Sequence, residues 1–272
     1  MPRFTTAACR LAVFDCDSTL TSIEGIDELA RLKGRFDYIA ELTRRAMNGE
    51  IKLEEVFAAR LELLRPTRAD LRRVALAYRQ HVTPDAREAI AALRFAGVRV
   101  FMVSGGLLPA VQEFARAIGL PGQNVRAVPI EFDQLSGQWW RYDRHQYGGN
   151  PDEVYLGLPP TPLVETQGKR RVIADLSGGE TRTMLVGDGV TDLEARDAVQ
   201  LFVGFGGVCR RERVATEAEV FIEANSLAAV VPLALSKDRQ AALRGTEHAA
   251  VLERGLSDID HGLVKFHDRP RR

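Results

Sequence analysis

The sequence predicts an α/β fold: a doubly wound parallel sheet with a small helical cap inserted after the first strand. Short apolar runs that stop at acidic, hydroxylic or glycine residues alternate with helical patterns along most of the 272 residues. A long stretch of helical patterns alone separates the first apolar run from the second. We therefore expect a sheet core, with a helical layer above the carboxyl ends of its strands.

Four apolar runs are expected to form parallel strands, because each is short and ends at a polar or glycine-rich segment. These runs are residues 11–14, 98–103, 183–186 and 199–203. Residues 218–222 are expected to add an edge strand. Apolar side chains recur at helical spacing over residues 85–95, 108–118 and 170–176. Ligands bind beyond the carboxyl ends of the strands in such sheets, so the polar segments mark the expected site.

The chain is expected to divide into three parts. They are a core of residues 1–23 and 80–235, a helical cap of residues 24–79, and a C-terminal extension of residues 236–272 whose role the sequence leaves open. Residues 133–167 are less regular, and we expect a hairpin or a long excursion beside the sheet. The extension has a helical pattern up to about Arg254, and we expect irregular structure beyond that residue.

The amino-acid composition argues against nucleic acid and membranes as partners. Lys and Arg total 37 and Asp and Glu total 37, so the basic excess that usually accompanies nucleic-acid or anionic-membrane binding is absent. No apolar stretch is long enough to cross a bilayer, and no signal-peptide pattern begins the chain. The three cysteines lack metal-site spacing and favour a reducing compartment. We expect a cytoplasmic protein, and the sequence does not determine its oligomeric state.

Residues 15–19 place two carboxylates two positions apart at the end of the first strand. The chain turns where a strand ends, so both side chains can face one cleft. Asp15 is suited to be a nucleophile that accepts a phosphoryl group. Asp17 is suited to be the general acid that protonates the leaving oxygen and then the base that activates water. An acidic loop with a capping hydroxyl has the same composition, so this segment alone leaves both interpretations open.

A second acidic segment, residues 187–192, follows the third apolar run. Converging carboxylates would repel a dianionic phosphate ester unless a divalent cation lay between them. Mg²⁺ suits such oxygen ligands. Asp15 and Asp188 are the expected direct ligands together with the main-chain carbonyl of Asp17, and Asp192 is expected to orient them. A helix N-terminus with acidic residues in its first turn is an equally simple interpretation of this segment alone.

Two further features suit phosphate binding. The Ser104 hydroxyl and the backbone N–H groups around Gly105 and Gly106 precede a helix and could cradle a phosphate, although a tight turn needs the same glycines. Lys169 stands before a helical run, where its charge could neutralise the phosphoryl group and keep Asp15 ionised. A single lysine is more often a solvated surface group. The four segments together, at three strand ends and one helix start, favour one phosphoryl-transfer site over unrelated features.

These four segments resemble the motifs of the haloacid dehalogenase superfamily, and further segments resemble its phosphoserine phosphatase family. The family-like segments are residues 14–20, 24–30, 46–49, 186–192 and 204–207, together with Arg60. The resemblance covers about residues 11–235. It implies a Rossmann-like core and Mg²⁺-dependent hydrolysis of O-phospho-L-serine through a phosphorylated Asp15, with a role in serine biosynthesis.

The resemblance also implies how the substrate is selected. Glu24 would pair with the substrate ammonium, and Arg60 would bind its carboxylate as a planar fork. The remaining substrate-binding candidates are Met47 and Leu53 in the lid, and Thr191 and Arg211 near the phosphate. Ordinary helix surface or cap core is the alternative for each, and Glu24 could simply favour a helix N-terminus.

Two rival functions remain open at this stage. The enzyme could act as a phosphatase or phosphotransferase on another small phosphomonoester. Alternatively, the chain could be a non-catalytic ligand-binding or scaffold protein on the same fold. The second rival would be marked by loss of Asp15, Asp17 or Lys169, and all three are present.

Overall fold

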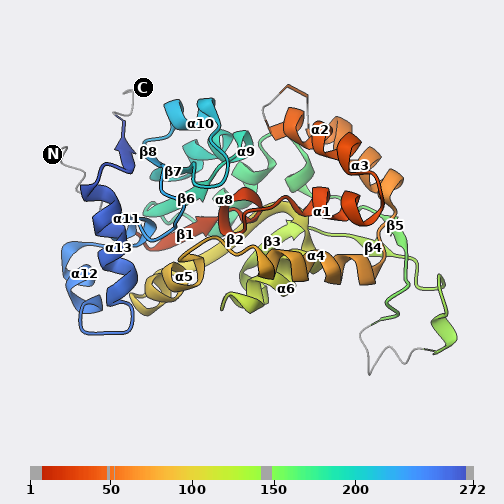
Figure 1. Ribbon diagram of the computed structural model, residues 1–272, viewed down its shortest axis with the longest axis horizontal. Helices are drawn as coiled ribbons and strands as arrows, with labels where there is room; N and C mark the ends of the chain where they lie inside the picture. Colours follow the sequence, from red (N-terminus) through yellow and green to blue (C-terminus); the bar gives the residue numbers. More distant parts are fainter. Residues whose placement is uncertain (1–7, 48–49, 52, 142–148, 268–272) are drawn as a thin grey trace.

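The computed structural model describes residues 8–47, 50–51, 53–141 and 149–267. A seven-stranded sheet runs through the molecule in the order β3-β2-β1-β6-β7-β8-β9 (Figure 1), and every pair is parallel except β8 with β9. The strands are β1 (Leu11–Phe14), β2 (Arg99–Leu107), β3 (Val125–Val128), β6 (Thr183–Gly187), β7 (Leu201–Phe205), β8 (Val220–Ile222) and β9 (Val264–Phe266). The predicted fold class is confirmed.

Two details of the sheet differ from the sequence prediction. β3 was not predicted, because it has only four residues and the exposed Arg126 interrupts its apolar pattern. Residues 218–222 do contribute β8, but the prediction that this strand is an edge was wrong. β9, from the C-terminal extension, pairs antiparallel with β8 and lies at the edge in its place.

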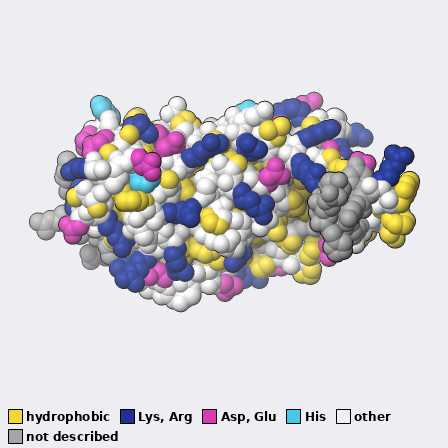
Figure 2. Space-filling model, turned by 90° about the horizontal axis from the view of Figure 1, so that it is seen from below, with side chains coloured by type: hydrophobic (Ala, Val, Ile, Leu, Met, Phe, Trp, Pro, Cys, Tyr) yellow, Lys and Arg dark blue, Asp and Glu magenta, His cyan; other side chains and the backbone are white. Residues whose placement is uncertain are grey.

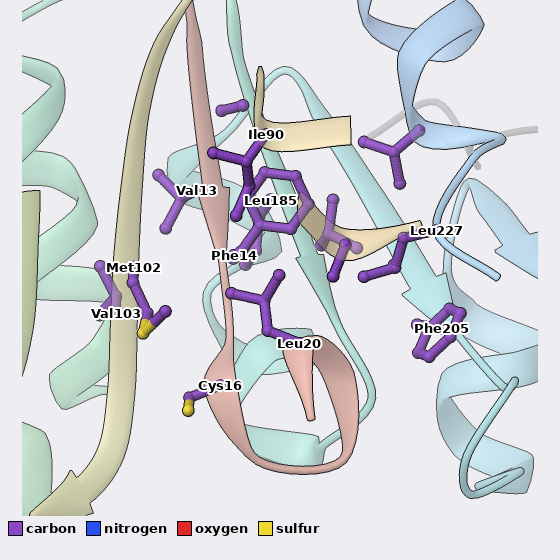
Figure 3. Packing of buried hydrophobic residues seen from close by; sticks show 14 of the residues in the cluster. Val13, Phe14, Cys16, Leu20, Ile90, Met102, Val103, Leu185, Phe205 and Leu227 are labelled. Atoms are coloured by element: carbon purple, nitrogen blue, oxygen red, sulfur yellow. The ribbon is translucent and has the colours of Figure 1, made fainter. Parts of the chain in front are cut away.

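The core is centred on β1, where every side chain from Leu11 to Phe14 is fully buried. Figure 3 shows Val13 and Phe14 lying among side chains of the neighbouring strands, including Met102 of β2 and Leu185 of β6. Burial of each large apolar side chain stabilises the fold by about 1.5–3 kcal/mol. The acidic loop that follows β1 is therefore attached to the most tightly packed strand of the sheet.

Four helices follow the loop after β1 and lie ahead of α5, in agreement with the long stretch of helical patterns predicted there. They are α1 (Gly25–Leu32), α2 (Phe36–Met47), α3 (Leu53–Leu64) and α4 (Arg68–Gln80). α4 begins with a capping box, in which Thr67 accepts from the Asp70 N–H at 3.1 Å and Asp70 accepts from the Thr67 N–H at 2.9 Å. The division of the chain into core, cap and extension stays a prediction.

The helices of the remaining chain flank the sheet. They are α5 (Ala86–Phe95), α6 (Leu108–Ala117), α8 (Gly168–Ser177), α9 (Val190–Glu194) and α10 (Glu212–Glu217). In Figure 1, α5 and α6 lie below the sheet, and α8, α9 and α10 lie above it. In the described ranges of the chain, none of the helices combines the length and the apolar character that a membrane crossing requires.

The less regular stretch contains an antiparallel pair, β4 (Glu131–Phe132) with β5 (Tyr155–Gly157), as expected for a hairpin beside the sheet. The residues just before β5 form hydrogen bonds with the first residues of α4. Arg68 Nε donates to Glu153 Oε2 at 2.6 Å, and the Arg68 guanidinium lies 4.3 Å from the centre of the Phe132 ring. The Ala69 N–H donates to the Pro151 carbonyl at 2.9 Å.

The C-terminal residues pack on the core. Their helices are α11 (Val230–Ala234), α12 (Lys237–Leu243) and α13 (Ala249–Asp260). The expectation of irregular structure beyond about Arg254 was wrong, because Leu256 and Ile259 continue the apolar face of α13 and pack against the core. Gly255 permits this packing, since a Cβ there would lie 2.3 Å from the Ala228 carbonyl oxygen.

Candidate active site

The loop after β1 holds Asp15 and Asp17 on one side of the chain. The Asp15 N–H donates to the Val186 carbonyl of β6 at 2.9 Å, and the Asp15 carboxylate accepts from the Cys16 N–H at 2.7 Å. Ser18 turns the chain with φ 51°, in the left-handed region that non-glycine residues seldom occupy. The Ser18 hydroxyl donates to Glu24 at 2.7 Å. The turn leaves Asp15 and Asp17 only 8% and 9% exposed.

Lys169 lies in the first turn of α8 and joins two carboxylates. Its Nζ is 2.9 Å from Asp15 Oδ2 and 2.7 Å from Asp192 Oδ1. Burial lowers the pKa of Lys169, but the charges of Asp15 and Asp192 outweigh burial and raise the pKa above its ordinary value. Lys169 is therefore a permanent cation beside Asp15. Only glycine fits at position 168, the first residue of α8, because a Cβ there would lie 1.5 Å from the Pro162 carbonyl oxygen.

Three carboxylates meet where β1 and β6 end. Asp15, Asp188 and Asp192 each offer an oxygen, and these oxygens lie within 4.8 Å of one another. Burial raises the pKa of Asp188 to about 6, and the Arg211 guanidinium, whose Nε lies 3.0 Å from Asp188 Oδ2, acts in the opposite direction. Thr19 donates to the other oxygen of Asp188 at 3.2 Å. Carboxylates collected in this way suit a hard, oxygen-seeking divalent cation.

Asp192 is the most deeply buried of the three carboxylates, at 0% exposed, and both its oxygens accept hydrogen bonds from within the protein. Oδ1 accepts from Lys169 at 2.7 Å, and Oδ2 accepts from the Gly189 N–H at 3.1 Å. Gly187 makes room for this side chain, because a Cβ there would lie 2.2 Å from Asp192 Cγ. Burial raises the pKa of Asp192 well above its usual range. These contacts suit a group that orients its neighbours.

Asp17 is surrounded by donors. Its Oδ1 accepts from the Gly25 N–H at 2.6 Å and from the Tyr78 hydroxyl at 2.7 Å, and its Oδ2 accepts from the Ser104 hydroxyl at 3.3 Å. Burial raises the pKa of Asp17 to about 6, although the Tyr78 bond opposes the shift. A carboxyl group in that range can give and take a proton near neutral pH. Ser104 also accepts from the Gly106 N–H at 2.9 Å, which braces the end of β2.

A pocket of about 900 Å³, open to solvent, connects these groups with the helices between β1 and β2. Asp15, Asp17, Lys169 and the glycines Gly105 and Gly106 line one end, which we call the phosphate end. Glu24, Arg60 and the apolar Phe57, Leu71 and Val74 line the other, which we call the cap end. Thr191 also lines the pocket.

The cap end carries charge that is only partly matched. Arg60 is 4% exposed, and its Nη1 donates to Thr43 at 3.2 Å. Its Nε is buried and has no hydrogen-bond partner among the residues that the structure describes. Burial lowers the pKa of Arg60 and raises the pKa of Glu24. Arg211 reaches both ends, 3.0 Å from Asp188 and 3.7 Å from Glu24.

Comparisons with known proteins agree with this geometry. A family model for haloacid dehalogenase-like hydrolases matches residues 9–199. The chain is 35% identical to the phosphoserine phosphatase of Bos taurus over 211 residues, which are 77% of this chain and 87% of that one. The Homo sapiens phosphoserine phosphatase is 34% identical over the same shares. The chain belongs to the haloacid dehalogenase-like hydrolases, in their phosphoserine phosphatase family.

Solved structures share the fold of this hydrolase family. A phospho-aspartyl intermediate analogue of phosphoserine phosphatase superposes with a TM-score of 0.67 at 23% identity, covering 83% of this chain and 99% of that one. The family model and the curated relatives show that the chain is an enzyme of the hydrolase class.

The structure brings most of the sequence-predicted residues together at this pocket, and it adds several that the sequence did not indicate. Asp15, Asp17, Glu24, Arg60, Ser104, Gly105, Gly106, Lys169, Asp188, Thr191, Asp192 and Arg211 all line the pocket or contact residues that line it. The side chains of Met47 and Leu53 lie outside the described residues. Tyr78 was missed, together with the pocket-lining Leu163, Glu165, Gln167 and Glu194. The spacing of Tyr78 on α4 indicates only a buried helix face.

Proposed function

We propose that this enzyme hydrolyses O-phospho-L-serine to L-serine and phosphate with Mg²⁺, through a phosphorylated Asp15. The observation that carries the proposal is the position of Asp15, ion-paired to the buried Lys169 at 2.9 Å, beside Asp17 in one pocket. The names of the relatives support phosphoserine as the substrate. Release of serine gives the enzyme a role in serine biosynthesis.

In the first half-reaction an Asp15 oxygen attacks phosphorus, and the bond from phosphorus to the serine oxygen breaks. Asp17 gives its proton to that oxygen, so serine leaves as a neutral alcohol and Asp17 becomes a carboxylate. Lys169, which is ion-paired to Asp15, offsets charge on the phosphoryl group. The backbone at Gly105 and Gly106 lines this end of the pocket at the start of α6, where it would hold phosphate oxygens.

In the second half-reaction Asp17 takes a proton from water, and the water oxygen attacks the phosphorus of phospho-Asp15. The bond from phosphorus to the Asp15 oxygen breaks, which releases phosphate and restores both aspartates. Asp15, Asp188 and the Asp17 carbonyl would hold Mg²⁺, while Asp192, fully buried and bonded to Lys169, would orient them. When bound, the ion supplies positive charge that lets a dianionic ester approach these carboxylates.

The cap end would select the serine part of the substrate. The buried and unmatched Nε of Arg60, judged over the described residues, fits a substrate carboxylate better than an apolar group. Glu24 would pair with the ammonium, since a cation there would compensate the cost of its burial. Thr191 and Arg211 would contact the phosphate side, and Met47 and Leu53 would cover the ligand.

The proposed site and the protein surface also bear on the enzyme's partners and location. The proposed partner is a small-molecule phosphomonoester, and neither nucleic acid nor a membrane is involved. On the face shown in Figure 2, Lys and Arg side chains are spread out and interspersed with acidic and apolar ones. Cys9, Cys16 and Cys209 are unpaired, which supports a cytoplasmic location.

A phosphate-release panel with Mg²⁺ tests the proposal. We expect kcat/KM for phosphoserine to exceed that for phosphothreonine, phosphoethanolamine and sugar phosphates by at least about 100-fold, because only phosphoserine satisfies both Glu24 and Arg60 without crowding. Preference for a sugar phosphate would replace the substrate but keep the reaction. Removal of metal by chelation should abolish turnover, and added Mg²⁺ should restore it. Undiminished activity in metal-free buffer would contradict the Mg²⁺ assignment.

A further inference from the structure

Tyr78 lies outside the motifs that carry the family resemblance, yet it contacts Asp17, the proposed acid–base residue. It is 1% exposed on α4, and its hydroxyl donates to Asp17 Oδ1 at 2.7 Å. The Gly25 N–H at the start of α1 donates to the same oxygen at 2.6 Å. Oδ1 therefore receives two short hydrogen bonds from two helices that lie between β1 and β2.

The position of the Tyr78 hydroxyl is fixed by packing. The ring contacts Phe114 of α6, with 5.3 Å between the ring centres. On the other side Gly25 leaves room that no other residue could leave, because a Cβ there would lie 1.9 Å from Tyr78 Oη. A buried phenol with so little freedom delivers its hydrogen bond to one place.

Asp17 Oδ2 has a different environment from Oδ1. Its hydrogen bond comes from the Ser104 hydroxyl at a longer 3.3 Å. Gly106 presents no side chain to it, and a Cβ at that position would lie 3.0 Å from Oδ2. Oδ2 therefore accepts one longer hydrogen bond where Oδ1 accepts two short ones, and it is the oxygen that faces Ser104 and Gly106 at the phosphate end of the pocket.

We infer that Tyr78 is a positioning residue that, with Gly25, engages Asp17 Oδ1 and leaves Oδ2 to exchange the proton in both half-reactions. The inference rests on the proposed function of Asp17. The Gly25 N–H can only donate. A proton on Asp17 Oδ1 would therefore be a third hydrogen on an oxygen that already accepts from the Gly25 N–H and the Tyr78 hydroxyl. Protonation of Oδ1 would also deprive a buried hydroxyl of its acceptor. The proton therefore resides on Oδ2, and a rotation that exchanged the two oxygens would break both short bonds.

Tyr78→Phe tests this role, because it removes the hydroxyl and keeps the ring against Phe114 and Gly25. With enzyme in excess over substrate, the first chemical step is observed directly. For phosphoserine, whose alkoxide must be protonated, we expect this step to slow by about 10- to 100-fold, with KM within about twofold. For p-nitrophenyl phosphate, whose leaving group needs no proton, the same step should slow by less than about twofold.

Phe114→Leu is the matched control, because it loosens the packing around Tyr78 without removing the hydroxyl. It should lower the urea midpoint of unfolding and change the ratio of the two substrates' rates far less than Tyr78→Phe does, because the hydroxyl remains. Equal slowing of both substrates by Tyr78→Phe would mean a merely structural role and would overturn the inference. So would unchanged rates in an active, folded variant. Failure of the parent to turn over phosphoserine would instead overturn the proposed function.

Discussion

At the phosphate end of the pocket, Asp15, Lys169 and Asp192 form a continuous chain of ion pairs at 2.9 and 2.7 Å, whereas at the cap end the Nε of Arg60 is buried without a partner in the described chain. The first arrangement is complete before any ligand arrives, which suits groups that stabilise a transition state. The second leaves a polar group whose hydrogen bond a ligand can supply. Substitutions at the phosphate end should therefore change kcat, and those at the cap end should change substrate preference.

The largest effect is expected for Asp15→Asn, which removes the nucleophile and keeps the shape of the side chain. We expect kcat to fall by more than about 1000-fold, because an amide does not form the acyl phosphate. Phosphate release by the purified variant measures this. Asp152→Asn, on the excursion before β5, is the matched control and should keep full activity. A variant at Asp15 within tenfold of the parent would remove it as nucleophile.

Lys169→Met should act on both activity and stability. We expect kcat to fall by about 100- to 1000-fold, since the cation beside the phosphoryl group is lost. Urea unfolding should also show a loss of about 3 kcal/mol, because Asp192 is 0% exposed and would lack its partner. The loss should grow as the pH rises, since burial favours the protonated form of Asp192 and stability is lost when that proton leaves.

The control for Lys169 is Lys237→Met, which changes an exposed lysine at the start of α12. It should leave kcat and the urea midpoint unchanged. Equal stability of the Lys169 variant and this control at every pH would show that the buried ion pairs do not hold the site together.

Arg60→Ala should change selectivity more than rate. We expect kcat/KM for phosphoserine to fall by about 10- to 100-fold, the equivalent of about 1.5–3 kcal/mol for a charge-assisted hydrogen bond. Phosphoethanolamine, which lacks the carboxylate, should lose less than about threefold. Parallel assays on both substrates check this, with the exposed Arg72→Ala on α4 as the control. Equal losses for the two substrates would contradict a carboxylate site at Arg60.

The smallest effect is expected for Arg68→Ala, at the junction of α4 with the excursion. The variant loses the stacking over Phe132 and the contact to Glu153, whose side chain is 1% exposed, so we expect about 1–3 kcal/mol less stability. Because Arg68 lies outside the pocket lining, kcat should be unchanged. Urea unfolding and steady-state assays measure both quantities against Arg73→Ala, an exposed neighbour. A large drop in kcat would mean that the excursion influences the phosphate end directly.

The difference between the two ends also explains what could be predicted from the sequence. Asp15 and Asp188 follow short apolar strands, Gly105 and Gly106 lie at the end of β2, and parallel strands carry their carboxyl ends to one edge of a sheet. Local pattern is therefore sufficient to bring them together. Strand β3 was not predicted because Arg126 interrupts its four-residue apolar run. Strand β9 was not predicted because it has only three residues, which pair with a strand distant in the sequence.

Contacts between residues far apart in the chain could not be predicted from the local sequence pattern. Tyr78 and Asp17 are 61 residues apart, and an apolar helix face conceals the hydroxyl that joins them. Arg60 could be placed only through a family resemblance, because a basic residue on a helix usually faces solvent. Its burial, and the unmatched Nε among the described residues, emerge only when α2 and α3 pack together.

The most direct test of the account is to locate the phosphoryl group on the enzyme. Enzyme mixed with phosphoserine and Mg²⁺, quenched in acid within a single turnover and digested with protease, can be mapped by mass spectrometry. The account predicts an added phosphoryl group on Asp15, which disappears when the quench is delayed beyond turnover and is absent from Asp15→Asn. Phosphorylation of another residue, or full phosphate release with no phosphorylated peptide at any time, would contradict it.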